Sequence, residues 1–388
     1  MIRIVTIIGA RPQFIKAAAL SRTIRRQFSK DIDEILVHTG QHYDENMSLV
    51  FFHELEIPEP AYNLNIGSAS HSKQTARMMV GIEEILKKED PDYLVVYGDT
   101  NSTLAAALVA AKMHIPIVHI EAGLRSFNKS MPEEINRIVC DHCSTLLFSP
   151  TRSGYQNLVN EGFREFSTKP FSADNPGIFH CGDVMYDNAI YFSQPDFEET
   201  GLPGSPEMKD TSFILATIHR NNNTDDVLRL TSILRAMLEI IKISGLRIVF
   251  PIHPRTKKML DQLPDRELLV QLKLNSLFEM IPPVSFLEMM TLEKTCRMII
   301  TDSGGVQKEA YFFNKPCIIA RSETEWIEIV ENGCAIVADA DEQRIVEAFK
   351  FFDTQPPLTF PPLFGDGNAA IFICRELINH YISTQKQC

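Results

Sequence analysis

The stretch YLVVYGDTNSTLAAALVAAKMHIPIVHIEAGLR, residues 93–125, decides the fold. Its first five residues are apolar or aromatic and suit a buried β-strand, and Ile117–Ile120 forms a second run of strand length. Between them, Leu104–Met113 has the length and composition of a helix. A strand, a helix and a strand in this order indicate parallel strands with a helix packed against the sheet.

The same alternation extends through both halves of the chain, which predicts an α/β protein with two doubly wound parallel-sheet domains of the Rossmann-like kind. The expected strands are Ile2–Ile8, Glu34–His38, Tyr93–Tyr97, Ile117–Ile120, Thr145–Phe148, Phe213–Ile218, Leu246–Pro251, Met298–Thr301, Cys317–Ala320 and Ala335–Val337. The expected helices include Ser72–Lys87, Leu104–Met113, Asp225–Ile243, Gly305–Phe313 and Ala369–Ser383. The turn-rich segment Arg164–Gly177 lies between the two series, so we place the domain boundary just beyond it, at residue 182.

Composition narrows the class of partner. The chain has 388 residues, of which 44% are hydrophobic, and 38 Lys and Arg against 50 Asp and Glu give a net charge of −12. This acidic balance, without a basic block, argues against nucleic acid as a partner. No apolar stretch approaches membrane-spanning length, so we expect no membrane partner and a cytoplasmic location. Eight cysteines are too sparse for a disulfide scaffold, and Cys140 and Cys143 are expected to pack in the core.

Polar residues follow the predicted strands where ligands bind in parallel sheets, at the carboxyl ends. A single one of these residues is more readily explained as a cap or a turn, but eight such sites in register are not. They are Gly9–Pro12, Thr39–His42, Gly98–Thr100, Glu121–Arg125, His219–Arg220, His253–Arg255, Asp302–Gly305 and Arg321.

Asp302-Ser303-Gly304-Gly305 opens a predicted helix with small residues, which leaves backbone N–H groups free to bind a phosphate. Glu309, one turn along, could then reach a ribose. The alternative is an ordinary serine N-cap. The first turn lacks the Gly-x-Gly-x-x-Gly fingerprint, so a nicotinamide cofactor is disfavoured. Arg11 and Lys16 instead suggest side chains that neutralise a diphosphate.

Four carboxylates, Asp99, Glu121, Glu133 and Glu134, lie near the same predicted edge. Carboxylates beside an anion site are electrostatically costly, which indicates general acid–base chemistry. For Glu133 and Glu134 a helix N-terminus is an alternative explanation. His219 is either a satisfied polar residue or a catalytic one. No zinc spacing and no serine nucleophile motif is present, so we expect neither a metal nor a cofactor.

Nine motifs together resemble the non-hydrolysing UDP-N-acetylglucosamine 2-epimerase family, including its UDP-2,3-diacetamido-2,3-dideoxyglucuronate branch. In chain order they are GARPQFIK (9–16), TGQHYDENM (39–47), YGDTNSTLA (97–105), HIEAGLRSF (119–127), MPEEINR (131–137), IHR (218–220), HPRT (253–256), TDSGGVQKEA (301–310) and FGDG (364–367). The resemblance implies two glycosyltransferase-B-like domains, 1–182 and 183–365, and a terminal helix, 366–388, that crosses back to the first. It also implies a UDP-sugar in the interdomain cleft and a homodimer.

The chemistry that this resemblance implies is anti elimination of UDP to a 2-acetamidoglycal, followed by re-addition to the other face. UDP-N-acetylglucosamine and UDP-N-acetylmannosamine would be interconverted in this way, supplying polysaccharide synthesis. Position by position, the resemblance makes Asp99, Glu121, Glu133 and His219 catalytic residues. It makes the following residues contacts of the UDP-sugar: Arg11, Gln13, Lys16, His42, Arg137, Arg220, His253, Phe286 near the uracil, Ser303, Gly304, Gly305, Glu309 and Arg321.

Departures from the family pattern bear on the substrate. Many members have glutamate where this chain has Gln13, and losing that charge would favour a substrate with its own carboxylate. Gln13-Phe14 and Thr324-Glu325-Trp326 resemble the diacetamidoglucuronate branch, so that UDP-sugar is the alternative substrate. The segment between Arg125 and Pro132 is shorter than in family members that are activated by substrate. This argues against allosteric activation by a second UDP-sugar. A glycosyltransferase of the same fold is the alternative of another class, and a non-catalytic nucleotide-sugar sensor comes third.

Overall fold

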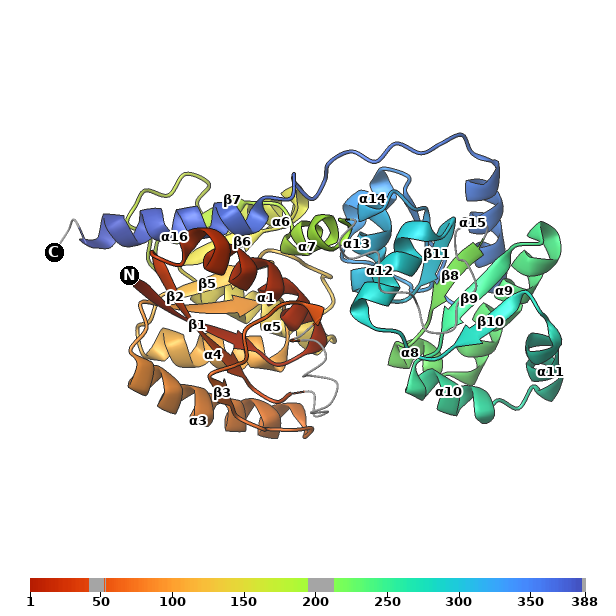
Figure 1. The fold of residues 1–388 in the computed structure, drawn as a ribbon, viewed down its shortest axis with the longest axis horizontal. Helices are drawn as coiled ribbons and strands as arrows, with labels where there is room; N and C mark the ends of the chain where they lie inside the picture. Colours follow the sequence, from red (N-terminus) through yellow and green to blue (C-terminus); the bar gives the residue numbers. More distant parts are fainter. Residues whose placement is uncertain (42–51, 53, 195–212, 386–388) are drawn as a thin grey trace. The chain divides into compact units, whose positions relative to one another are not determined.

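The computed structural model describes residues 1–41, 52, 54–194 and 213–385. The chain divides into unit 1, Met1–Tyr191 with Pro362–Cys388, and unit 2, Phe192–Pro361. In both units the described strands form a wholly parallel sheet with helices on its two faces (Figure 1). The predicted fold class, an α/β protein with two doubly wound parallel sheets, is confirmed.

Unit 1 has a seven-stranded sheet in its described part, in the order β3-β2-β1-β4-β5-β6-β7. The strands are β1 (Ile2–Ile8), β2 (Ile32–His38), β3 (Tyr62–Asn63), β4 (Tyr93–Tyr97), β5 (Ile117–Ile120), β6 (Leu146–Ser149) and β7 (Gly177–His180). The helices are α1 (Arg11–Thr23) with the π-helical turn η1 (Ile24–Phe28), α3 (His71–Glu89), α4 (Asn101–Lys112), α5 (Pro132–Cys143), α6 (Arg152–Asn160), α7 (Val184–Phe192) and α16 (Ala369–Gln385).

The central strands of unit 1 are buried on both faces, which is why they read as continuous apolar runs. Helices α3, α4 and α5 cover one face, and Cys140 of α5 is part of that core, as expected. Helices α1 and α16 pack together on the other face, where Phe148 of β6 contacts Phe372 of α16 (Figure 1). The C-terminal helix therefore completes the core of unit 1.

Unit 2 has a six-stranded sheet in its described part, in the order β10-β9-β8-β11-β12-β13. Helices α9 and α15 bury one face of this sheet, and α12, α13 and α14 lie on the other (Figure 1). The strands are β8 (Phe213–Thr217), β9 (Arg247–Pro251), β10 (Phe278–Ile281), β11 (Met298–Thr301), β12 (Cys317–Ile319) and β13 (Ala335–Val337). The helices are α8 (Asn221–Thr224), α9 (Val227–Ser244), α10 (Pro254–Asp261), α11 (Arg266–Leu274), α12 (Phe286–Thr295), α13 (Gly304–Phe312), α14 (Ile327–Glu331) and α15 (Glu342–Thr354).

The units divide after Tyr191 and after Pro361, whereas the predicted boundaries are at 182 and 365. The first difference arises because α7 packs with unit 1. Asn188 of α7 accepts a 2.7 Å hydrogen bond from Arg22 and donates one to the carbonyl of Ile15. Asp187 accepts hydrogen bonds from the backbone N–H groups of Ala369 and Ala370 at the start of α16, at 3.1 and 2.8 Å. Gly182, where we placed the boundary, therefore precedes a helix that still belongs to the first unit.

Candidate active site

Strand order reverses direction between β1 and β4 in unit 1, and ligands of open parallel sheets bind at such a switch point. The loops that leave these two strands are Gly9-Ala10 and Gly98-Asp99-Thr100. Arg11 begins α1 directly after the first loop, and Thr100 is the N-cap of α4 after the second. The predicted polar residues of the first and third strands are thus brought to one place.

Gln13, predicted to contact the UDP-sugar, has a buried side chain that is hydrogen-bonded within the protein. Its Oε1 accepts hydrogen bonds from the N–H groups of Gly9 and Ala10, at 2.9 and 3.1 Å. Its Nε2 donates to the carbonyl of Tyr97 and to Thr103 Oγ1, at 3.1 and 3.0 Å. Gln13 therefore fixes the β1 loop against the end of β4, and its neutral amide suits the Tyr97 carbonyl.

Lys16 of α1 and Glu121, which follows β5, form an ion pair in which each side chain is about one-tenth exposed or less, at 8% and 10%. Gly98 lies beneath this pair, since a methyl group at Gly98 would be 3.0 Å from Lys16 Nζ and 3.2 Å from Glu121 Oε1. Glu121 has a φ of +73°, a conformation that costs a non-glycine residue free energy. The surrounding structure therefore holds the backbone of Glu121 in a strained conformation, and this conformation fixes where its carboxylate lies.

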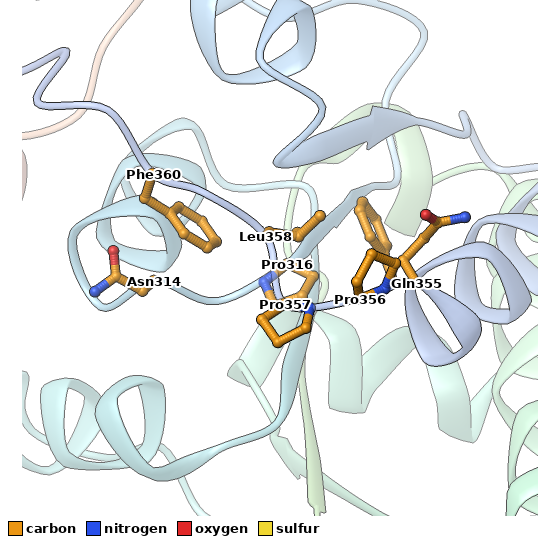
Figure 2. A pocket seen from close by; sticks show the side chains of 8 residues that line it. Asn314, Pro316, Gln355, Pro356, Pro357, Leu358 and Phe360 are labelled. Atoms are coloured by element: carbon orange, nitrogen blue, oxygen red, sulfur yellow. The ribbon is translucent and has the colours of Figure 1, made fainter.

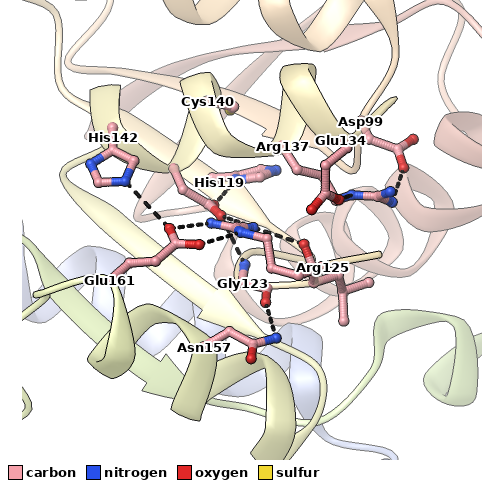
Figure 3. A network of polar contacts seen from close by, with 12 residues as sticks. Asp99, His119, Gly123, Arg125, Glu134, Arg137, Cys140, His142, Asn157 and Glu161 are labelled. Atoms are coloured by element: carbon pink, nitrogen blue, oxygen red, sulfur yellow. Dashed lines mark hydrogen bonds and ion pairs between the residues drawn. The ribbon is translucent and has the colours of Figure 1, made fainter. Parts of the chain in front are cut away.

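Asp99 forms an ion pair with Arg137 of α5, with 2.6 Å between Oδ2 of Asp99 and Nη1 of Arg137 (Figure 3). The guanidinium of Arg137 is buried. Burial raises the pKa of Asp99 above its usual value, and the nearby carboxylates Glu121 and Glu133 add to the rise. Arg137 and Lys16 oppose the shift without cancelling it. Asp99 is therefore a carboxyl group that keeps its proton to higher pH than usual, beside a carboxylate that is ion-paired.

The neighbouring glutamates Glu133 and Glu134 differ in their surroundings. Glu134 is buried and accepts hydrogen bonds from the backbone N–H groups of Ser126 and Phe127, both at 2.9 Å. It also accepts a 3.3 Å hydrogen bond from Arg137 Nε (Figure 3). It is thus a structural residue that holds the loop before α5. Glu133 lies in the first turn of α5, is half-buried, and is close enough to affect the pKa of Asp99. Of the two, Glu133 is the one that is partly exposed and near Asp99.

In unit 2 the strand order reverses between β8 and β11, and Asp302 joins the two loops that leave these strands. Its fully buried carboxylate accepts hydrogen bonds from the N–H groups of His219 and Arg220, both at 3.0 Å, and from Asn223 Nδ2 at 3.0 Å. It also lies 3.3 Å from Nδ1 of His219. The sequence places Asp302 among the polar residues that follow the strands, but it predicts no role for the Asp302 side chain.

Two arginine side chains and one carboxylate lie at the start of α13. Ser303 is the N-cap, because its Oγ accepts a 3.4 Å hydrogen bond from the N–H of Val306. A methyl group at Gly304 would lie 3.8 Å from a guanidinium nitrogen of Arg220 and of Arg321, and 3.7 Å from Oε2 of Glu325. Gly304 thus faces two cations at a positive helix end, as a phosphate site requires. Glu325 pairs with both terminal nitrogens of Arg321, at 3.0 and 3.1 Å.

The remaining predicted contacts are distributed as follows. His253 is the N-cap of α10, and its ring centroid is 6.0 Å from that of His219. Gly305 and Glu309 lie in α13, where Glu309 is buried. Phe286 is buried against Phe192, with ring centroids 5.9 Å apart, and is not an open aromatic surface. His42 lies outside the described residues.

A separate pocket in unit 2 lies at the opposite edge of the sheet, before β12, and is lined by Asn314, Pro316, Phe352, Gln355, Pro356, Pro357, Leu358 and Phe360 (Figure 2). It has no titratable side chain, so it cannot supply acid–base chemistry. Within the described part of the chain, no group of three or more His, Cys, Asp and Glu side chains could hold a metal ion. No helix there is long and apolar enough to cross a membrane.

The family model described as UDP-N-acetylglucosamine 2-epimerase matches residues 25–378, which is most of the chain. The chain belongs to the UDP-N-acetylglucosamine 2-epimerase family. Among its relatives, the UDP-2,3-diacetamido-2,3-dideoxy-D-glucuronate 2-epimerase of Pseudomonas aeruginosa is 47% identical over 375 residues, covering 97% of this chain and 99% of the relative. A UDP-N-acetylglucosamine 2-epimerase homolog of Methanococcus maripaludis is 46% identical over 381 residues, with the same coverage of both chains.

Solved structures agree with this membership of the epimerase family. The UDP-GlcNAc 2-epimerase of Methanocaldococcus jannaschii, in complex with UDP-GlcNAc and UDP, superposes with a TM-score of 0.84 at 39% identity. The match covers 97% of this chain and all of the solved chain. The resemblance seen in the sequence motifs is therefore confirmed at the level of family and fold.

Proposed function

We propose that the protein is a UDP-2-acetamido-sugar 2-epimerase, and that UDP-N-acetylglucosamine and UDP-N-acetylmannosamine are its substrate and product. One observation carries this proposal: two carboxyl groups in different environments lie near the β1/β4 switch point. Asp99 has a raised pKa, and Glu121 forms an ion pair with Lys16. A proton must leave carbon 2 on one face and return on the other, and two carboxyl groups in different environments suit these two tasks.

The reaction that we propose begins with removal of the proton at carbon 2 and departure of UDP from carbon 1, which forms a 2-acetamidoglycal. UDP then adds back at carbon 1 while carbon 2 receives a proton on the opposite face, so no atom is gained or lost overall. The start of α13 in unit 2, with Gly304, Arg220 and Arg321, would hold the diphosphate. Arg11 and Lys16 of unit 1 would neutralise its charge as it leaves.

The chain's 47% identity to a UDP-2,3-diacetamido-2,3-dideoxy-D-glucuronate 2-epimerase supports a second candidate substrate. Both reactions share one mechanism and differ in the substituents at carbons 3 and 6. Gln13 does not decide between them by direct contact, because its amide is occupied within the protein. The choice of sugar is therefore a question for direct assay.

The test is incubation of the purified protein with each UDP-sugar alone, followed by proton NMR of the products. We expect UDP-N-acetylglucosamine to give the manno epimer with no second reactant. Conversion of only the diacetamidoglucuronate would support the second candidate. A glycosyltransferase or a sensor would leave both sugars unchanged in the absence of an acceptor, and that result would contradict the proposal.

A homodimer, a cytoplasmic location and a role in polysaccharide synthesis remain predictions of the family resemblance. Light scattering of the purified protein tests the first of them, with a mass of about twice 44.0 kDa expected. A mass close to that of one chain would contradict the dimer without affecting the proposed reaction.

A further inference from the structure

A second polar network lies directly behind the candidate carboxylates in unit 1. It is centred on His119 of β5, which Figure 3 labels, and on Asp141 of α5. Both side chains are fully buried. His119 Nδ1 donates a 2.7 Å hydrogen bond to Asp141 Oδ1, and its Nε2 donates a 2.9 Å bond to the carbonyl of Gly98. Neither residue was selected from the sequence, although His119 lies in the quoted motif 119–127.

His119 Nε2 faces a carbonyl and its Nδ1 faces a carboxylate, so an imidazolium, which donates from both ring nitrogens, suits this geometry. The Gly98 carbonyl has no proton to give. Asp141 Oδ2 accepts a 3.1 Å hydrogen bond from the N–H of Gly123 and forms a 2.8 Å ion pair with Nη1 of Arg125. Burial disfavours the charged ring, but Cys140 and Asp141 outweigh it and raise the pKa of His119 well above its ordinary value.

This network reaches both candidate catalytic carboxylates through the backbone. The Gly98 carbonyl, which accepts from His119, belongs to the peptide unit that leads into Asp99. On the other side, Asp141 holds Gly123 and Arg125, which follow Glu121 in the same turn. Arg125 is in turn fixed by two hydrogen bonds to Glu161, at 2.6 and 2.7 Å (Figure 3).

We propose that His119 and Asp141 are positioning residues that hold Asp99 and Glu121 in a fixed mutual arrangement. The inference deepens the proposed epimerase function and rests on it. The strained backbone of Glu121, with its φ of +73°, needs such support, because a residue in that region returns to a relaxed conformation when its neighbours allow it. Gly98, held by His119 on one side, supports the Lys16–Glu121 pair on the other.

The kinetic test compares His119→Gln and Asp141→Asn with His142→Gln. His142 is the matched control, because it also contacts this network, 3.3 Å from Glu161, but its side chain is 50% exposed. We expect His119→Gln and Asp141→Asn to lower kcat by about 10- to 100-fold, since small misplacements of reacting groups have effects of that size. The Kd for UDP should stay within about twofold in both, because neither residue is among those that we propose to bind the diphosphate. Folded variants with normal kcat would overturn the proposal.

A second measurement does not depend on variants that fold or on activity. In protein labelled with ¹⁵N-histidine, we expect one histidine to keep both ring nitrogens protonated from pH 6 to pH 9. The charged and titratable groups that face His119 are Asp141 and Cys140 on α5, with Arg125 next to Asp141. If every histidine titrates normally, the buried ion pair is absent and the proposal fails. An inactive wild-type enzyme with this untitrated histidine would contradict the proposed function and leave the ion pair established.

Discussion

At the scale of single residues, the environment of a side chain separates groups that look alike in sequence. Glu133 and Glu134 are adjacent, yet Glu134 is a buried acceptor of backbone N–H groups and Glu133 remains half-buried near Asp99. Gln13 lies in a motif that predicts sugar contact, but its amide oxygen bonds to the loop after β1 and its amide nitrogen bonds to Tyr97 and Thr103. These assignments depend on distances between residues far apart in the chain, which a sequence pattern does not contain.

The raised pKa of Asp99 predicts a specific pH dependence. A carboxyl group with a raised pKa keeps its proton to higher pH, so an enzyme that uses Asp99 as its acid loses activity as the pH rises through that pKa. We therefore expect the alkaline limb of the kcat profile to disappear in Asp99→Asn, together with a large loss of rate. If the variant keeps the limb unchanged, another group is the acid.

At the scale of elements, the sequence predicts most of the parallel strands, because strands buried on both faces are continuous apolar runs. The strands β1, β4, β5, β11 and β13 begin and end where the apolar pattern does. The edge strands β3, β7 and β10 were not predicted. β3 has only two residues, and β7 and β10 each have one exposed residue and incomplete burial, so none has a strong apolar signal.

Gly123 illustrates how tightly the turn after β5 is packed. A methyl group there would lie 2.2 Å from the carbonyl oxygen of Gly154, and the φ of Gly123 is +80°. Gly162 has a φ of +98° with nothing within 4 Å, so it is a matched control for the backbone effect alone. We expect Gly162→Ala to cost about 1–2 kcal/mol and Gly123→Ala about 3 kcal/mol or more. Thermal unfolding of the two variants checks this order, and equal unfolding temperatures would contradict it.

The start of α16 carries a predicted pH dependence of stability. Burial raises the pKa of Asp187 to about 6, even though its bonds to Ala370 and Ala369 oppose the shift. Between pH 4 and 6 the folded protein therefore binds more protons at this site than the unfolded chain, and its contribution to the free energy of unfolding falls as the pH rises.

We expect this fall, on the order of 2 kcal/mol, to be absent in Asp187→Asn. Asp366→Asn is the control, because Asp366 is exposed and bonds only locally, to the N–H of Asn368 at 3.2 Å. Chemical unfolding at several pH values measures the difference. An identical pH slope in Asp187→Asn and wild type would rule out a titrating Asp187.

At the scale of the whole molecule, the two units have different proposed roles. Unit 1 contains the carboxyl groups proposed for proton transfer, and unit 2 contains the helix end proposed for the diphosphate. The motifs predicted both places, because the carboxyl ends of parallel strands can be located from sequence. The supporting residues His119 and Asp141 were missed, and the partners of Asp302 were not predicted, since a buried polar side chain carries no sign of its partner.

These separate roles predict that a substitution in unit 2 can weaken UDP binding, whereas a substitution in unit 1 can lower the rate of epimerisation. Trp326 is the single tryptophan of the chain, and its Nε1 donates a 2.9 Å bond to the carbonyl of Gly304, so its fluorescence should report UDP binding. We expect Arg321→Gln to raise the Kd for UDP by about 10-fold or more, because it removes charge-assisted hydrogen bonds. Arg297→Gln, at the opposite edge of the same sheet, should bind normally. Equal Kd values for the two variants would contradict the proposed diphosphate site.

The most direct test of the central claim is the reaction in deuterated water with UDP-sugar alone, followed by NMR at carbon 2. The account predicts that the wild-type enzyme places deuterium at carbon 2 of the epimerised product. It predicts a rate at least about 100-fold lower in Asp99→Asn, Glu121→Gln and Glu133→Gln, and a normal rate in the exposed control Glu165→Gln. Epimerisation without deuterium at carbon 2, or near-normal rates in all three variants, would contradict it.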